Sequence, residues 1–109
     1  MPPVKIVRTF RHSSDLKRLK ALPGDVDAME RAIAARPESG DVIRGLKGVR
    51  KARFRIGNRG KSGGGRTIYY VMWADDSVLM ITAYAKSEKE DLTPDDRKAI
   101  LALVLELNR

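Results

Sequence analysis

The 109-residue chain contains no cysteine. This absence excludes disulfide bonds, zinc sites built on thiolates, and cysteine nucleophiles. No apolar run approaches the roughly 18 residues that a membrane-spanning helix needs. The N-terminal stretch also lacks the apolar segment of a signal peptide. We therefore expect a soluble, cytoplasmic protein.

Residues that commonly carry catalysis are also scarce. Histidine occurs once, at His12, and a lone histidine beside a helix start is more often structural or solvated than catalytic. The sequence offers no Ser-His-Asp set, no carboxylate pair at an evident catalytic spacing, and no cluster of metal ligands. Neither a metal ion nor any other cofactor is predicted. Any catalysis would therefore depend on lysine, arginine and tyrosine.

Acidic residues are missing from one long stretch, residues 42–74, although the chain as a whole has 14 of them. Its cations are Arg44, Lys47, Arg50, Lys51, Arg53, Arg55, Arg59, Lys61 and Arg66. With a net charge of +8, this clustering favours a polyanionic partner, chiefly nucleic acid. The alternatives are a basic surface that only maintains solubility, or one that docks an acidic protein.

The apolar pattern predicts a single α+β domain spanning residues 1–109, with an antiparallel sheet at its centre. A short strand over 4–10 is followed by a helical hairpin. Its first helix covers 13–22, with Ser13 or Ser14 as N-cap, and its second is capped by Asp25. The strands that follow cover 51–56, 66–73 and 77–86, the last two forming a hairpin. A final helix has Thr93 as its N-cap and Pro94 at its first position.

The segment "GKSGGGR" at 60–66 is similar to a phosphate-binding loop in its glycines and its lysine-serine pair. The Walker A pattern needs a glycine five residues before Gly60, where the chain has Arg55, and it needs a helix after the serine. Here a β-branched and aromatic run follows, so a hairpin connection is favoured over a nucleotide loop. The alternative is a mobile, solvated hairpin tip. Antiparallel pairing of the flanking strands would bring Arg53, Arg55 and Arg66 together on one face of the sheet.

RNA is a suitable substrate for such a face because it carries its own nucleophile, the 2′-hydroxyl. Cleavage needs in-line geometry, stabilisation of added negative charge, and assistance to the departing 5′ oxygen. Lysines and arginines can supply the electrostatics, and aromatic side chains can stack a splayed base. The candidate aromatics are Tyr69, Tyr70, Trp73 and Tyr84, some of which must be core residues because successive strand residues face opposite ways.

The segments "RGKSGGGRTIYY" and "ITAYAKSEKEDLTPDD" resemble the RelE/HigB superfamily of bacterial toxins, most closely its HigB-like branch. The resemblance covers roughly residues 37–98. It implies a small α+β domain with a curved antiparallel sheet, and metal-independent cleavage of messenger RNA in the ribosomal A site. It also implies a cognate antitoxin with a helix-turn-helix domain, through which alone the toxin would reach operator DNA. No membrane partner is implied.

The resemblance also implies roles for individual residues. Arg66 would bind the scissile phosphate, Arg53 and Arg55 would stabilise the transition state, and Lys86 would assist proton transfer or the leaving group. The predicted RNA contacts are Lys51, Arg59, Lys61, Tyr70, Tyr84 and Lys89.

The chain departs from relatives that place a tyrosine just beyond the last strand, since it has "SEKEDL" there. Glu88 or Asp91 could handle a proton instead. Two other functions stay open: a ParE-type poison of DNA gyrase that works without catalysis, and a degenerate module that only binds RNA or an antitoxin.

Overall fold

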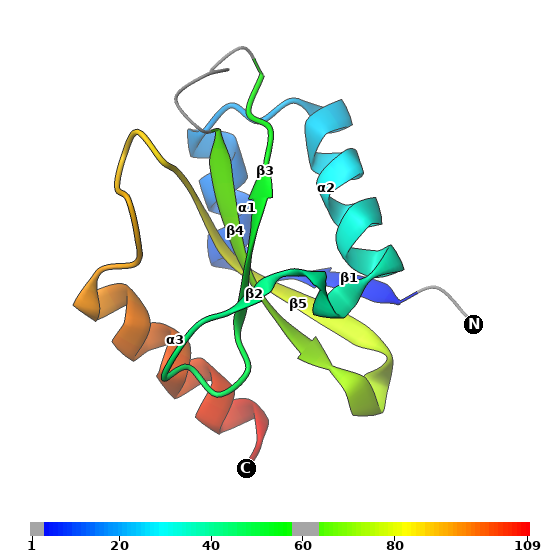
Figure 1. Cartoon of the computed structure of the whole chain (residues 1–109), viewed down its shortest axis with the longest axis vertical. Coiled ribbons are helices and arrows are strands. Elements are labelled where there is room, and N and C mark those ends of the chain that lie inside the picture. The colour runs from blue at the N-terminus through cyan, green and yellow to red at the C-terminus, as the bar shows by residue number, and fades with distance from the viewer. Residues whose placement is uncertain (1–3, 58–63) are drawn as a thin grey trace.

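A computed structural model describes residues 4–57 and 64–109 of the chain (Figure 1). Its helices and strands are β1 (Lys5–Arg8), α1 (Phe10–Arg18), α2 (Pro23–Ala35), β2 (Asp41–Val42), β3 (Arg50–Phe54), β4 (Gly65–Met72), β5 (Ser77–Ala85) and α3 (Pro94–Leu107). Single 3₁₀ turns follow α2 and β4, as η1 (Pro37–Ser39) and η3 (Trp73–Asp75). This arrangement confirms the predicted α+β class.

The strands form one sheet in the order β1-β5-β4-β3-β2. The predicted hairpin of β4 and β5 is confirmed, and β3 pairs antiparallel with β4. The antiparallel sheet predicted at the centre of the domain is confirmed, and at one edge β1 runs parallel to β5, a pairing that was not predicted. Between β1 and β5 the chain forms α1, α2 and the strands β2, β3 and β4, and a parallel pair needs a long connection of this kind. The two-residue strand β2 was not predicted.

Helices cover both faces of the sheet and create a separate apolar core on each. The first face packs against α1 and α2, with a core that includes Leu16, Met29, Ile33, Phe54, Tyr69 and Met80. The second packs against α3, with a core that includes Leu46, Val49, Ile68, Ile81, Ile100 and Val104. All nine residues of β5 are buried, as expected for a central strand that is covered on both sides.

The helix starts differ in part from those predicted. Helix α1 begins at Phe10 rather than near Ser13, because the Thr9 hydroxyl accepts a hydrogen bond from the backbone of His12. Helix α2 begins at Pro23 after Leu22, whose side chain makes no capping bond. Helix α3 begins as predicted: Thr93 and Asp96 form a reciprocal capping box. In the described ranges, 4–57 and 64–109, no helix has both the length and the apolar character needed to cross a membrane.

Asp25 does not cap α2 as predicted, since it lies in the first turn of that helix. Its carboxylate accepts a 2.9 Å hydrogen bond from the backbone of Gly57 instead. Asp25 therefore ties the chain just beyond β3 to the start of α2. The sequence predicted a capping role for Asp25 because its hydrogen bond with Gly57, 32 residues further along the chain, leaves no signal in the local sequence.

Candidate nucleic-acid interface

Arg53 and Arg66 lie directly opposite each other on neighbouring strands. Arg53 of β3 is the register partner of Arg66 of β4, and Arg66 is in turn the partner of Tyr84 of β5. Residues paired in an antiparallel ladder project from the same face of the sheet, so these three side chains form a row across it. The predicted convergence of Arg53 and Arg66 is thus a consequence of strand register.

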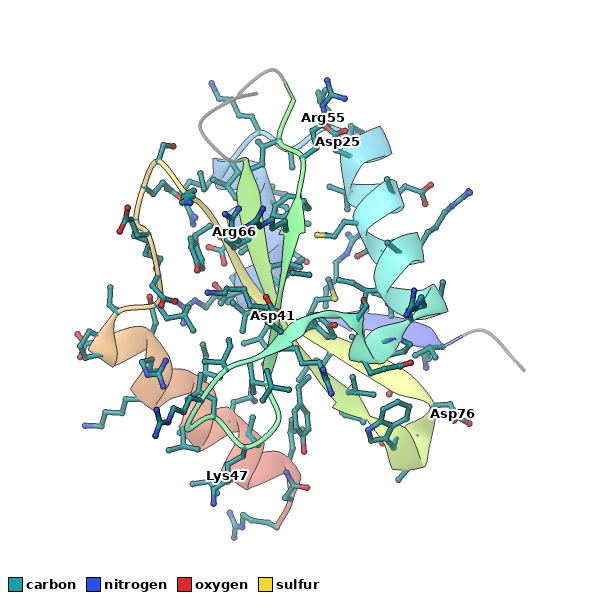
Figure 2. All side chains as sticks on the ribbon, viewed as in Figure 1. Asp25, Asp41, Lys47, Arg55, Arg66 and Asp76 are labelled. Atoms are coloured by element: carbon teal, nitrogen blue, oxygen red, sulfur yellow. The ribbon has the colours of Figure 1, made fainter. Side chains whose placement is uncertain are left out.

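Arg53 and Arg66 of this row border a pocket of about 530 Å³ at the end of the second face. The pocket is lined by Ser39, Gly40, Asp41, Lys51, Ala52, Arg53, Arg66, Lys86 and Glu90. Four of these residues are cations and two are acids, so the lining carries an excess of positive charge. Figure 2 shows Arg66 on β4 and Asp41 on β2 near it. The arrangement brings together four of the cations that were singled out from sequence.

The glycines before Arg66 allow β3 and β4 to approach closely. A Cβ at Gly65 would lie 2.5 Å from the ring of Phe54, and one at Gly64 would lie 2.8 Å from the Phe54 carbonyl oxygen. Gly64 also has a φ of +56°, which disfavours other residues. The close approach permits the pairing that sets Arg66 opposite Arg53. This part of the glycine run therefore has a packing role, which the hairpin-tip interpretation did not include.

Lys86 and Lys89 begin the segment that follows β5, but they have different surroundings. Lys86 is exposed and lines the pocket, and its backbone N–H donates to the Gly64 carbonyl at 3.0 Å. Lys89 donates to Asp96 at 2.6 Å, and its Nζ lies 5.2 Å from the centre of the Tyr84 ring. The Lys89 side chain is therefore held by contacts with Asp96 and Tyr84 of the same chain. Lys86 is the lysine of this pair that faces the pocket.

The two tyrosines predicted to contact RNA are not displayed on the pocket surface. Tyr84 is only 1% exposed, burial raises the pKa of its phenol, and its hydroxyl has no hydrogen-bond partner among the residues described. Tyr70 is half-buried against the α3 side, and its hydroxyl accepts a 3.2 Å hydrogen bond from Asn108. Neither ring is placed to stack on a base in the pocket in this conformation.

Of the remaining predicted residues, Lys51 lines the pocket and also lies 3.7 Å from Asp91. Arg55 is exposed and outside the lining, and its Nε donates to the Gly57 carbonyl at 3.3 Å. Figure 2 places Arg55 beside Asp25, away from Arg66. The structure therefore separates Arg55 from the other predicted arginines. Arg59 and Lys61 lie outside the described residues.

Two carboxylates in the lining, Asp41 and Glu90, were not singled out from sequence. Asp41 lies on β2, a two-residue strand that is too short to show an alternating pattern in the sequence. Glu90 lies in a run of charged residues that is typical of a solvated surface. Of the two acids that were singled out, Asp91 lies 3.7 Å from Lys51 and outside the lining, and Glu88 has other partners. It forms an ion pair with Arg18 and accepts a hydrogen bond from the Ala85 backbone. The hydrogen bond from Arg18 lowers the pKa of Glu88.

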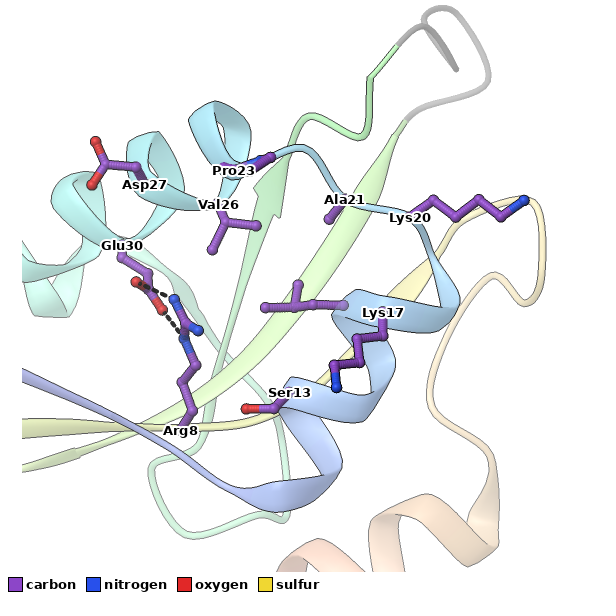
Figure 3. A pocket seen from close by; sticks show the side chains of 10 residues that line it. Arg8, Ser13, Lys17, Lys20, Ala21, Pro23, Val26, Asp27 and Glu30 are labelled. Carbon is purple, nitrogen blue, oxygen red and sulfur yellow. Dashed lines mark hydrogen bonds and ion pairs between the residues drawn. The ribbon is translucent and has the colours of Figure 1, made fainter.

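A second hollow, of about 420 Å³, lies between α1 and α2 and contains none of the predicted site residues. Figure 3 shows its apolar floor, including Ala21, Pro23 and Val26, with the Arg8–Glu30 ion pair at one end. Its charged rim is partly neutralised by that pair. The pocket around Arg53 and Arg66 is the more suitable of the two for a polyanion.

The residues described contain no group of three or more His, Cys, Asp and Glu side chains that could hold a metal ion. The chemistry that the pocket itself offers is electrostatic: two arginines on adjacent strands with lysines on either side. Such an arrangement suits a phosphodiester, since arginine can bind phosphate oxygens through two parallel hydrogen bonds.

Fold and pocket together define a small α+β domain with a cationic site at one end of its sheet. A family model described as the RelE toxin of the RelE / RelB toxin-antitoxin system matches residues 24–108. The chain therefore belongs to the RelE family of toxins. Its fold is also similar to that of a free-state variant of the Escherichia coli toxin RelE in which two arginines are replaced by alanine. That match has a TM-score of 0.55 and 18% identity, and it covers 81% of this chain and 88% of the other.

Proposed function

We propose that this toxin is an endoribonuclease that cleaves messenger RNA on the ribosome, with its active site in the pocket around Arg53 and Arg66. The observation that carries the proposal is the register of β3 and β4, which sets the two arginines side by side on one face. Lys51 and Lys86 extend the positive charge around them. A bent RNA backbone could present one phosphate to the arginines and its neighbours to the lysines.

In the proposed reaction the RNA 2′-oxygen attacks the adjacent phosphorus. A bond from the 2′-oxygen to phosphorus forms and the bond to the 5′ oxygen breaks, giving a 2′,3′-cyclic phosphate and a 5′-hydroxyl. Arg66 holds the scissile phosphate, and Arg53 stabilises the charge that develops on its oxygens. Lys86 delivers a proton to the departing 5′ oxygen. Asp41 and Glu90 are the carboxylates in the lining that can accept the 2′ proton.

The mechanism needs no metal ion, because the arginines and lysines provide the electrostatic stabilisation that a metal would otherwise supply. Arg55 lies outside the pocket, so any part it takes would be in binding a longer stretch of RNA. The toxin-antitoxin family also supports a cognate antitoxin as partner. We propose a helix-turn-helix antitoxin and action in the cytoplasm.

The test is to map RNA 5′ ends after induction, and to measure cleavage of messenger RNA on programmed ribosomes with purified protein. Arg66→Ala and Arg53→Ala should each reduce the cleavage rate on the order of 10²- to 10³-fold, as expected when a group that stabilises the transition state is lost. Lys98→Ala is the control: it removes one exposed positive charge on α3, outside the pocket lining. It should cleave at close to the wild-type rate.

Circular dichroism and thermal melting would establish that each variant is folded. A folded Arg66→Ala protein with wild-type cleavage would refute the assigned site. Induction that damages DNA without new messenger RNA ends would instead support gyrase poisoning. Binding of RNA or antitoxin with no cleavage by the wild-type protein would support a degenerate binding module.

A further inference from the structure

A chain of ion pairs and hydrogen bonds connects α1 to the segment that follows β5. Its members are Asp15 and Arg18 of α1, and Glu88. None of the three lines the cationic pocket, and the family resemblance gave neither α1 residue a role. They line a separate polar hollow of about 180 Å³.

Asp15 anchors this network to the end of β5. It is 7% exposed, and one of its carboxylate oxygens accepts hydrogen bonds from the Thr82 hydroxyl at 2.5 Å and the Ala83 backbone at 3.0 Å. The other oxygen accepts from Arg18. Burial acts to raise the pKa of Asp15, but these hydrogen bonds outweigh it and lower the pKa. Asp15 is therefore a fixed anion against β5.

Arg18 extends the network from Asp15 to Glu88. Its Nε and one terminal nitrogen each lie 3.1 Å from a Glu88 carboxylate oxygen, so the pair is bidentate. The same terminal nitrogen also lies 3.3 Å from the Ala83 carbonyl oxygen. Bidentate pairing restricts the orientation of both side chains more than a single contact does. Arg18 thus holds Glu88 in one direction, toward α1.

Glu88 in turn shapes the chain beside Lys86. Its carboxylate accepts a 2.9 Å hydrogen bond from the Ala85 backbone, and its own N–H donates to the Ala85 carbonyl at 2.9 Å. Lys86 lies inside this tight turn and faces the pocket on the opposite side. Three residues further on, Lys89 is fixed to Asp96 from the α3 side. The segment that carries Lys86 is therefore held at both ends.

We propose that Arg18 and Glu88, anchored by Asp15, are positioning residues that hold Lys86 in the geometry needed for RNA cleavage. The proposal rests on the proposed endoribonuclease function. Arg18 and Glu88 are 48% and 38% exposed at their side chains, and ion pairs this open to solvent add little to global stability. Loss of the pair should therefore change the reaction more than the fold. Misplacement of a reacting group by about 1 Å can cost on the order of 10²-fold in rate.

The test compares Arg18→Ala, Arg18→Lys and Glu88→Gln with the matched control Arg31→Ala. Arg31 also forms an exposed ion pair, with Asp27 of the same helix at 2.9 Å, and neither residue lines the cationic pocket or the polar hollow around Arg18. Arg18→Ala should lower kcat for cleavage of ribosome-bound messenger RNA about 10- to 100-fold with little change in KM. Arg18→Lys should recover part of that loss, and Arg31→Ala should match wild type.

A second readout does not depend on catalysis. The Lys86 amide donates to the Gly64 carbonyl at 3.0 Å, so its hydrogen-exchange protection reports whether this segment is held in place. Exchange at Lys86 should accelerate in Arg18→Ala and Glu88→Gln, and it should be unchanged in Arg31→Ala. Melting temperatures should show that all variants stay folded.

Wild-type kcat together with unchanged Lys86 exchange in Arg18→Ala would overturn the proposal, as would a change confined to KM. If the wild-type protein does not cleave RNA, the proposed function fails and positioning for that reaction fails with it. In that case accelerated Lys86 exchange would still show that the network holds the segment.

Discussion

The two faces of the sheet handle polar groups in different ways. On the face covered by α1 and α2, most buried polar atoms bond within the chain: His12 Nε2 with the Thr67 hydroxyl at 2.9 Å, and the Tyr69 hydroxyl with the Pro37 carbonyl at 2.7 Å, while His12 Nδ1 has no partner among the described residues. On the other face, the register places Arg53 beside Arg66. Like charges placed directly opposite on neighbouring strands are destabilising. The first face thus places its buried polar groups in contacts within the chain, whereas the second carries two neighbouring arginines, to which we propose an RNA phosphate binds.

The comparison can be tested most strongly at His12, which is fully buried on the α1 side. Burial lowers its pKa from 6.5 to about 4, so the folded protein holds the neutral form. Between these two values the unfolded chain binds a proton that the folded chain does not. Stability should therefore be lost as the pH falls from 6.5 to 4, by about 3 kcal/mol for this shift.

Urea unfolding at several pH values would measure this loss, with His12→Gln as the comparison because glutamine does not titrate. The depressed pKa values of Asp15 and Glu88 add a loss of stability as the pH falls through about 4.5 and below, and His12→Gln shares this loss because it has the same carboxylates. An equal decline in wild type and His12→Gln from pH 6.5 to 4 would show that His12 is not held neutral.

Paired substitutions of the two buried tyrosines compare the faces directly. The Tyr69 hydroxyl donates to the Pro37 carbonyl at 2.7 Å and accepts from the Gly40 backbone at 2.9 Å. Tyr69→Phe should cost about 2 kcal/mol in unfolding free energy, because both backbone groups lose a partner. Tyr84→Phe should change it by less than about 0.5 kcal/mol, since the Tyr84 hydroxyl has no partner among the described residues. Equal losses in denaturant titrations would remove this distinction between the faces.

The smallest effects are expected at the threonines that cap helices on opposite sides of the sheet. Thr9 caps α1 and its hydroxyl also donates to the Ile81 carbonyl at 2.7 Å, whereas the Thr93 hydroxyl caps α3 alone. Thr93→Ala should cost about 1 kcal/mol, and Thr9→Ala should cost more because it also leaves a carbonyl without its partner. Melting temperatures of the two variants would rank them, and the reverse order would contradict the structure.

Much of the fold followed from local patterns. The alternation in 51–56, the long apolar run of β5 and the Thr93-Pro94 helix start each carry a signal within a few residues. The start of α1 was predicted several residues late, since Ser13 and Ser14 looked like caps as good as Thr9. The parallel pairing of β1 with β5 could not be predicted, because local sequence patterns do not indicate which edge of the sheet a distant strand joins. Membership of the HigB-like branch stays a prediction.

The candidate site was predicted unevenly. Arg53, Arg66, Lys51 and Lys86 were singled out, and all four line one pocket. Arg55 was expected beside them because alternation puts it on the same face as Arg53, but β3 ends at Phe54 and the chain turns toward Asp25. Asp41 and Glu90 were missed, since nothing local distinguishes a pocket carboxylate from a solvated one. Their catalytic roles stay predictions.

By itself, the sequence determined the fold class, the family and the stretch of chain where positive charge gathers. These depend on composition, periodicity and short motifs, which are properties of neighbouring residues. Only the tertiary structure decided which cations meet. Strand register set Arg66 opposite Arg53, the end of β3 removed Arg55, and the ion pair from Arg18 turned Glu88 away from the pocket. Each of these depends on contacts between residues far apart in the chain, and local sequence does not encode them.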